Sequence, residues 1–224
     1  MSAPSLPTSG ATPPALGLAG AGAYRPRELV RDVVALADAA GAQRFSVAGH
    51  DWGAIVGWWL ARAAPQRLDR LTVVSTPHPR AVFKALFSSD QAIRASYIAL
   101  VQVPVLAEAL IRPRLGGMLR SAGLPEEIAQ RYALRMAEPG ALTAAFNWYR
   151  AALLPGGGRP GGEGPIRVPT RFVWGSRDPV LRRRAAELTG DYVAAPSDFV
   201  ELKGGHWLPE KHPDELGDLI LRPL

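Results

Sequence analysis

The chain has 224 residues, of which 47% are hydrophobic, and this is enough for one domain with a sizeable core and an inserted subdomain. It has no cysteine, which excludes disulfides, thiolate catalysis and cysteine-based metal sites. Its net charge of +6 comes from scattered arginines without interleaved aromatics or a nucleic-acid motif, so we expect no nucleic-acid partner.

Residues 1–23 are rich in Ala, Pro, Gly and Ser, and this composition predicts a disordered N-terminal segment. The segment lacks the positively charged start of a secretory signal. The sequence also has no apolar run long enough to cross a bilayer. We therefore expect a cytoplasmic protein without a membrane partner.

The first folded part is predicted over residues 24–79. Apolar residues at helical spacing indicate a helix over 24–41, and RFSVA (44–48) is typical of a short buried strand. AIVGWWLARAA (54–64) predicts a second helix, and LTVVS (71–75) a second strand. A strand, a helix and a strand with such short connections predict a parallel crossover unit.

The second part, residues 80–164, is predicted to be a helical cap with a hinge. Strand patterns disappear from 80 to 152, where amphipathic or apolar helical segments alternate with Pro and Gly. PGGGRPGGEGP (155–165) follows without a preceding strand and without the Gly-Lys-Ser/Thr ending of a phosphate loop. We interpret it as a flexible return from the cap to the core.

The third part, residues 165–224, returns to alternating strands and helices. TRFVWG (170–175) and FVELKGG (199–205) predict strands, residues 181–189 predict a helix between them, and a last helix begins after Pro213. The whole pattern predicts an α/β fold with a mostly parallel sheet, into which the cap is inserted.

The motif GHDWG, Gly49 to Gly53, has the frame of a nucleophile elbow with Asp51 at its centre. A strand precedes the motif and a helix follows it, which is the context that an elbow requires. The glycines on either side are expected to avoid clashes in a strained turn. The alternative is that Asp51 is an ordinary helix N-cap.

An elbow nucleophile requires an acid and a histidine, in that chain order. Asp178 follows the strand that contains Trp174, and His206 follows the next strand. Both therefore lie at carboxyl ends of strands, where open parallel sheets place their active groups. The alternatives are a turn or helix cap for Asp178 and a surface position for His206.

The motifs GHDWG, WGSRDPVL and GGHWLPE, in this order around a helical insertion, resemble the epoxide hydrolase branch of the α/β-hydrolase fold family. The resemblance runs from about Tyr24 to the C-terminus. It implies that Asp51 is the nucleophile, His206 the base that activates water, and Asp178 the acid that orients the histidine. Haloalkane dehalogenases share the aspartate nucleophile.

Two cap tyrosines of epoxide hydrolases donate hydrogen bonds to the epoxide oxygen, and this sequence matches the surroundings of both. Tyr97 lies in SYIALVQVP, before a Gln-x-Pro, and Tyr149 lies in FNWYR. Either tyrosine alone is typical of helix packing. Together, on separate cap helices, they favour proton donors and an epoxide substrate.

The resemblance also implies an oxyanion donor, the backbone N–H of Trp52, and a small hydrophobic epoxide as the substrate. It implies no metal and no organic cofactor, because the nucleophile and the base are side chains. The oligomeric state is not indicated. The expected pocket residues are His50, Phe83, Phe87, Leu100, Val101, Phe146 and Trp207.

The family's His-Gly-x-Pro signature, which supplies a second oxyanion donor, does not occur in the sequence. We therefore expect a chain that is N-terminally shortened relative to the family, with the strand at 44–48 as an exposed apolar edge. Formation of an Asp51 ester creates no oxyanion, whereas its hydrolysis does. Since the loss of one donor typically slows such a step about 10²–10³-fold, activity is expected to stall at the ester.

Two other interpretations remain open at this point. A haloalkane or haloacid dehalogenase would use the same aspartate but release halide. A non-catalytic remnant or binding module would also be compatible with a shortened sheet.

Overall fold

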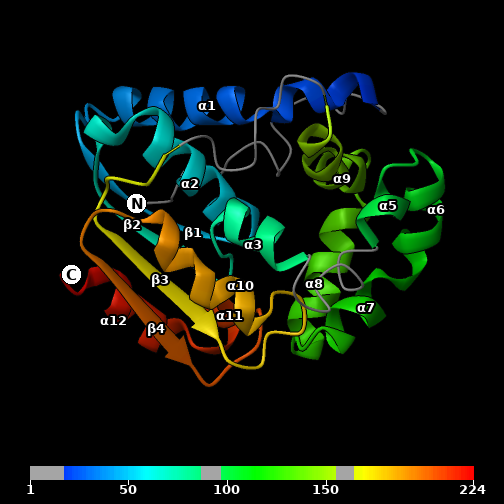
Figure 1. The fold of residues 1–224 in the computed structure, drawn as a ribbon. Coiled ribbons are helices and arrows are strands. Elements are labelled where there is room, and N and C mark those ends of the chain that lie inside the picture. The colour runs from blue at the N-terminus through cyan, green and yellow to red at the C-terminus, as the bar shows by residue number, and fades with distance from the viewer. Residues whose placement is uncertain (1–17, 87–96, 155–163) are drawn as a thin grey trace. The chain divides into compact units, whose positions relative to one another are not determined.

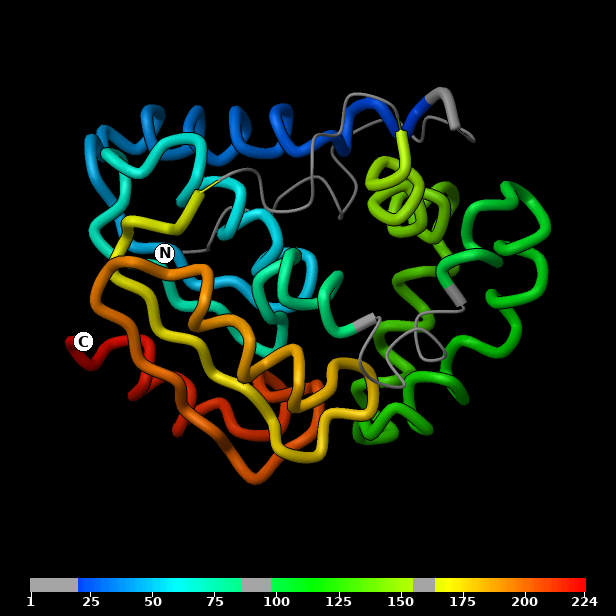
Figure 2. The backbone as a smooth tube through the Cα atoms, viewed as in Figure 1, coloured from blue at the N-terminus to red at the C-terminus, as the bar shows by residue number. Residues whose placement is uncertain are grey.

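The computed structural model describes residues 18–86, 97–154 and 164–224. The chain forms two compact units, each built from two separate stretches. One comprises Met1–Leu36 and Ser96–Gly157, and we call it the cap unit. The other, the core unit, comprises Ala37–Ala95 and Gly158–Leu224, which Figure 2 traces in blue to cyan and then in yellow to red. Residues 155–163 of the predicted hinge (155–165) lie outside the described residues.

The core unit contains a four-stranded sheet with the order β1-β2-β3-β4 (Figure 1). Its strands are β1 (Phe45–His50), β2 (Leu68–Val74), β3 (Thr170–Gly175) and β4 (Ser197–Leu202). Every neighbouring pair is parallel, so the carboxyl ends of the strands lie along one edge of the sheet. The predicted parallel sheet is thus confirmed.

The crossover between β1 and β2 contains α2 (Trp52–Ala63) and the short 3₁₀ helix η2 (Pro65–Arg67). Gly57 allows α2 to lie close to the sheet, because a Cβ atom there would come within 2.8 Å of the Leu71 side chain. Trp58, on the same helix, is fully buried. The crossover therefore fixes the start of α2, which directly follows Asp51.

The other core helices follow the remaining strands: α3 (Pro79–Leu86) after β2, α10 (Arg183–Leu188) with η4 (Thr189–Tyr192) after β3, and α11 (Leu208–Lys211) with α12 (Pro213–Leu221) after β4. Apolar residues from three strands and both C-terminal helices form a hydrophobic cluster. Its buried members are Val74, Val173, Leu202, Leu208 and Leu216.

Within the described residues β1 pairs only with β2 and therefore lies at an edge of the sheet, as predicted. The side chains of Phe45 and Val47 are half-buried, and Ser46 and Ala48 are exposed. β4 forms the opposite edge of the described sheet.

The cap unit is helical, as predicted for the insertion. It contains the first part of α1 (Pro26–Ala39) and a series of short helices. These are η1 (Leu18–Tyr24), α5 (Tyr97–Val101), α6 (Leu106–Ile111), η3 (Arg112–Arg114), α7 (Leu115–Ser121), α8 (Glu126–Ala137) and α9 (Ala141–Ala152).

Two predicted boundaries differ from the structure. The prediction of disorder up to residue 23 is wrong from residue 18 onward, because η1 packs in the cap unit, where Ala21 is fully buried and the Tyr24 ring meets Trp148 edge-on at 5.6 Å. The expected start of the cap at residue 80 also differs, because α3 belongs to the core unit. The residue just before α3 is bonded within this unit, since the His78 backbone N–H donates to Thr189 Oγ1 over 3.1 Å.

Candidate active site

Asp51 occupies the turn between β1 and α2 with φ 52° and ψ −119°. A non-glycine residue with positive φ is strained, and such strain is typical of an elbow nucleophile. The Asp51 side chain is 43% exposed. Among the residues that the structure describes, it makes no capping hydrogen bond to α2. The geometry thus favours the elbow over the alternative of an N-cap.

The two glycines of the elbow are not equivalent. A Cβ atom on Gly49 would collide with the carbonyl of Gly53 and lie 2.7 Å from the Ala54 nitrogen. A Cβ atom on Gly53 would meet no described atom within 4 Å. The prediction that both glycines avoid a clash is therefore correct for Gly49 and wrong for Gly53, because the helix turns away from the strand at that point.

This difference predicts that two matched substitutions destabilise the protein to different extents. Gly49→Ala should lower the free energy of unfolding by about 3 kcal/mol or more, because backbone atoms cannot move aside as a flexible side chain can. Gly53→Ala should change it by less than about 1 kcal/mol. Urea unfolding followed by circular dichroism measures both values, and equal losses would contradict the different roles of the two glycines.

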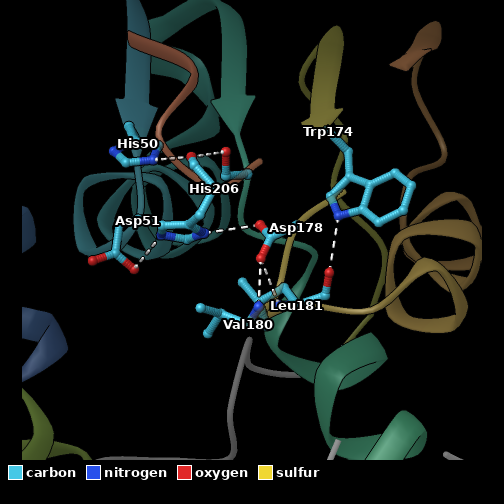
Figure 3. Close-up of polar contacts among 8 residues, drawn as sticks. His50, Asp51, Trp174, Asp178, Val180, Leu181 and His206 are labelled. Atoms are coloured by element: carbon cyan, nitrogen blue, oxygen red, sulfur yellow. Dashed lines mark hydrogen bonds and ion pairs between the residues drawn. The ribbon is translucent and has the colours of Figure 1, made fainter. Parts of the chain in front are cut away.

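Asp178 and His206 form a close pair at the carboxyl ends of β3 and β4 (Figure 3). His206 Nδ1 lies 2.8 Å from Asp178 Oδ2, and the carboxyl side chain is fully buried. Asp178 Oδ1 accepts the backbone N–H groups of Val180 and Leu181 over 2.7 and 2.9 Å. The Trp174 indole N–H donates to the Leu181 carbonyl over 3.1 Å, which holds this loop.

The two carboxylate oxygens of Asp178 therefore serve different purposes. Oδ1 caps a turn, as the alternative interpretation held, and Oδ2 orients the histidine. Because a carboxylate only accepts hydrogen bonds, the Nδ1 atom of His206 must donate, and its Nε2 atom faces away from Asp178. His206 is 5% exposed, so the alternative of a surface histidine is wrong.

His206 Nε2 points toward Asp51 and lies 3.7 Å from its Oδ1 (Figure 3). This separation exceeds a normal hydrogen bond, and a shift of less than about 1 Å would close it. The imidazole thus lies between two carboxylates, of which Asp178 is buried and Asp51 is accessible.

Burial disfavours a charged imidazole, but the hydrogen bond to Asp178 and the negative charges of Asp178 and of nearby Asp51 outweigh it and raise the pKa of His206 to about 10. Burial alone would raise the pKa of Asp51, yet the close approach and positive charge of His206 hold it below its usual value. At neutral pH these shifts favour an imidazolium at His206 beside a negatively charged Asp51.

The carbonyl of His206 accepts two hydrogen bonds from other strand ends. His50 Nε2 lies 2.9 Å from this oxygen and must donate to it, and Ser75 Oγ donates over 2.7 Å. His50 was predicted to line the pocket, and the structure places its ring 5.0 Å from the His206 ring and 6.0 Å from Trp207. Ser75 was missed, because a serine after a strand gives no signal of this role.

The predicted tyrosines lie on two cap helices, α5 and α9. The Gln102 amide donates to the carbonyls of Ile98 and Tyr149 over 3.2 and 3.3 Å, which links these helices. Tyr149 is half-buried against the cap's hydrophobic cluster. The Tyr97 side chain lies outside the described part of the chain, so its predicted role remains a prediction.

The other predicted pocket residues have different environments. Phe146 and Val101 are buried in the hydrophobic cluster of the cap unit, and Leu100 packs against it. Phe83, on α3, is 54% exposed, whereas Phe87 lies outside the described residues. The Trp207 ring meets His206 edge-on at 5.4 Å. The Trp52 backbone N–H contributes to the lowered pKa of Asp51, and its role as an oxyanion donor stays a prediction.

No group of three or more His, Asp or Glu side chains in the described ranges is arranged to hold a metal ion. Likewise, none of the described helices is long and apolar enough to cross a membrane.

Residues 3–213 match the model of the alpha/beta hydrolase fold family. The chain belongs to this family. The predicted α/β-hydrolase fold family is thereby confirmed, and Asp51, Asp178 and His206 follow one another in the chain in the order predicted for a nucleophile, an acid and a histidine.

The chain is 33% identical over 215 residues to AB hydrolase superfamily protein YfhM of Bacillus subtilis (strain 168), covering 92% of this chain and 74% of that protein. It is 27% identical over 207 residues to epoxide hydrolase 4 of Mus musculus, covering 86% of this chain but only 57% of the mouse protein. This α/β hydrolase therefore spans little more than half of the mouse relative's length.

Among solved structures, this α/β hydrolase is similar to epoxide hydrolase A from Mycobacterium thermoresistibile, with a TM-score of 0.73 and 25% identity. The similarity covers 95% of this chain and 78% of that chain.

Proposed function

We propose that this α/β hydrolase opens a small hydrophobic epoxide to a vicinal diol through a covalent ester on Asp51. The observation that carries the proposal is the aspartate at the strained elbow, 3.7 Å from a histidine that is paired with a buried carboxylate. A carboxylate can displace at a saturated carbon and leave an ester that water can cleave. A serine there would give an ether, which water does not readily cleave.

In the first step a carboxylate oxygen of Asp51 forms a bond to one ring carbon, and the strained C–O bond breaks toward the epoxide oxygen. Tyr97 and Tyr149 would both donate hydrogen bonds to that oxygen as it gains charge, and one of them would transfer its proton to form the hydroxyl group of the ester intermediate. The Gln102 amide, which bonds to the backbone of α5 and α9, supports this assignment because it ties together the two helices that carry the tyrosines.

In the second step His206 takes a proton from water, which attacks the ester carbonyl of Asp51. The bond between the carbonyl carbon and the alkyl oxygen then breaks, the leaving oxygen takes the proton from His206 to complete the diol, and the proton left on Asp51 returns to the tyrosine. Asp178 holds the Nδ1–H of the imidazole, so that Nε2 is the atom that accepts the proton. Esterification removes the Asp51 charge that helps raise the pKa of His206, and the imidazolium can then lose its proton and act as a base. The Trp52 N–H would donate to the oxyanion.

Incubation of the protein with a styrene-oxide-like epoxide tests the proposal. We expect intact-mass measurement to show the addition of one epoxide, peptide mapping to place it on Asp51, and diol to accumulate only slowly, because the missing oxyanion donor should slow hydrolysis of the ester about 10²–10³-fold. An Asp51→Asn variant is the control and should gain no mass. An unmodified wild-type protein that also makes no diol would contradict the proposal, whereas halide release from a haloalkane without diol formation from epoxides would favour a dehalogenase.

A further inference from the structure

The nucleophile and its base come from opposite edges of the described sheet. Asp51 follows β1, whereas His206 follows β4. Three strand spacings of about 4.8 Å separate these edges, roughly 14 Å in total. The segment from Lys203 to His206, which we call the return loop, must therefore run back across the ends of the intervening strands to bring the imidazole toward Asp51.

The return loop crosses β3 at Gly175. A Cβ atom on Gly175 would collide with the Gly205 carbonyl and lie 2.7 Å from the Gly204 oxygen. Backbone hydrogen bonds hold the crossing, since the Ser176 N–H donates to Leu202 O over 2.9 Å and the Arg177 N–H donates to Gly204 O over 2.8 Å. The loop thus lies directly on the end of β3, where only glycine leaves room for it.

Beyond β3 the loop is held by the end of β2. Ser75 Oγ donates to the His206 carbonyl over 2.7 Å, and Ser75 is fully buried. Its backbone N–H donates to Val173 O over 2.8 Å. Ser75 also has φ 61°, a conformation that costs a non-glycine residue about 1 kcal/mol or more. Glycine would adopt this conformation without strain. In Ser75 the hydrogen bond from the hydroxyl to the His206 carbonyl offsets the backbone strain.

We propose that Ser75 is a positioning residue: its hydroxyl holds the His206 carbonyl and thereby sets the place of the imidazole between Asp178 and Asp51. The inference rests on the proposed function, because it assigns Ser75 to the step in which His206 activates water. The second donor to the same carbonyl, His50, limits how far the loop shifts when the Ser75 hydroxyl is lost.

The effect of losing the hydroxyl should differ between the two chemical steps. Hydrolysis of the ester depends on where His206 Nε2 lies, and a displacement of about 1 Å can slow a reaction about 100-fold. Because His50 remains, we expect Ser75→Ala to slow ester hydrolysis about 10-fold. Formation of the ester depends on Asp51 and the tyrosines and should change less than about 2-fold.

Ser75→Ala and Ser75→Gly separate the hydroxyl from the backbone strain, and Thr170→Val is the matched control. Thr170 is also buried and donates its hydroxyl to a backbone carbonyl, Val168 O, over 2.7 Å. Ester formation and decay are followed by intact mass after epoxide is added and removed. Proton NMR of the Nδ1–H of His206, which bonds to Asp178, reports the position of the ring without any substrate.

We expect both Ser75 variants to show the slower decay and a shifted Nδ1–H resonance, although Ser75→Gly is the more stable of the two. Thr170→Val should change neither readout. An unchanged resonance and decay in Ser75→Ala, or equal changes in Thr170→Val, would overturn the proposal. If the wild-type protein forms no ester, the proposed function fails, and the resonance alone still decides whether Ser75 positions His206.

Discussion

Replacing His206 with glutamine should leave the protein trapped as its covalent ester. In the proposed mechanism Asp51 attacks the epoxide carbon without help from the imidazole, so the mass of one epoxide should still be added. Hydrolysis loses its general base, which typically contributes about 10²–10⁴-fold to the rate of such a step. After removal of the epoxide, the modified mass should therefore decay at least about 100-fold more slowly than in the wild-type protein, as measured by an intact-mass time course.

His212→Gln is the matched control for this result. His212 lies near His206 in the sequence, is partly exposed, and contacts Glu215 over 3.4 Å instead of a catalytic carboxylate. The Asp51 ester of the His212→Gln variant should decay at the wild-type rate. Rapid decay of the ester in His206→Gln would show that another group activates the water.

Asp51→Asn should lower the pKa of His206 from about 10 by about one unit or more toward its ordinary value of about 6.5, because Asp51 supplies part of the negative charge that raises it. Proton NMR of the imidazole as a function of pH measures this change. The pKa should remain above the ordinary value, since the pair with Asp178 persists.

The same substitution should alter how stability depends on pH. A histidine whose pKa is raised in the folded state stabilises the protein fully below about pH 6.5, and this contribution is lost as the pH rises toward about 10. In the Asp51→Asn variant this stabilising contribution should be lost completely at a lower pH, because the pKa of His206 in the folded state is lower. Asp69→Asn is the control, because it removes an equal charge from an exposed pair with Arg44. An equal shift of the His206 pKa in both variants would mean that the Asp51 contact has no special effect.

The elbow could be predicted from the sequence because its signal is local. A strand, a glycine-framed aspartate and a helix are adjacent in the chain, and Asp51 takes the positive φ that this pattern implies. The acid and the histidine could be predicted because both follow strands of a parallel sheet, whose carboxyl ends share one edge. Their pairing at 2.8 Å agrees with that placement.

The features that were missed depend on contacts between distant segments. Ser75 is recognisable only when the return loop lies above it, and the different needs of Gly49 and Gly53 depend on the path of the helix backbone. The 3₁₀ helix η1 (Leu18–Tyr24) meets a partner far along the chain, since the Tyr24 ring contacts Trp148. Composition alone indicates disorder there, because the partner surface is not visible in the local sequence.

The placement of Asp51 and His206 on opposite edges of the described sheet makes their separation sensitive to sheet twist. Each neighbouring strand is typically rotated by about 20–25° relative to the last, so a small change in twist adds up across the sheet. The 2.8 Å contact between Asp178 and His206 joins adjacent strands, whereas the 3.7 Å separation from Asp51 spans the described sheet and is limited by the hydrogen bonds of His50 and Ser75 to the His206 carbonyl. Loss of either hydrogen bond should therefore change the 3.7 Å separation more than the 2.8 Å contact.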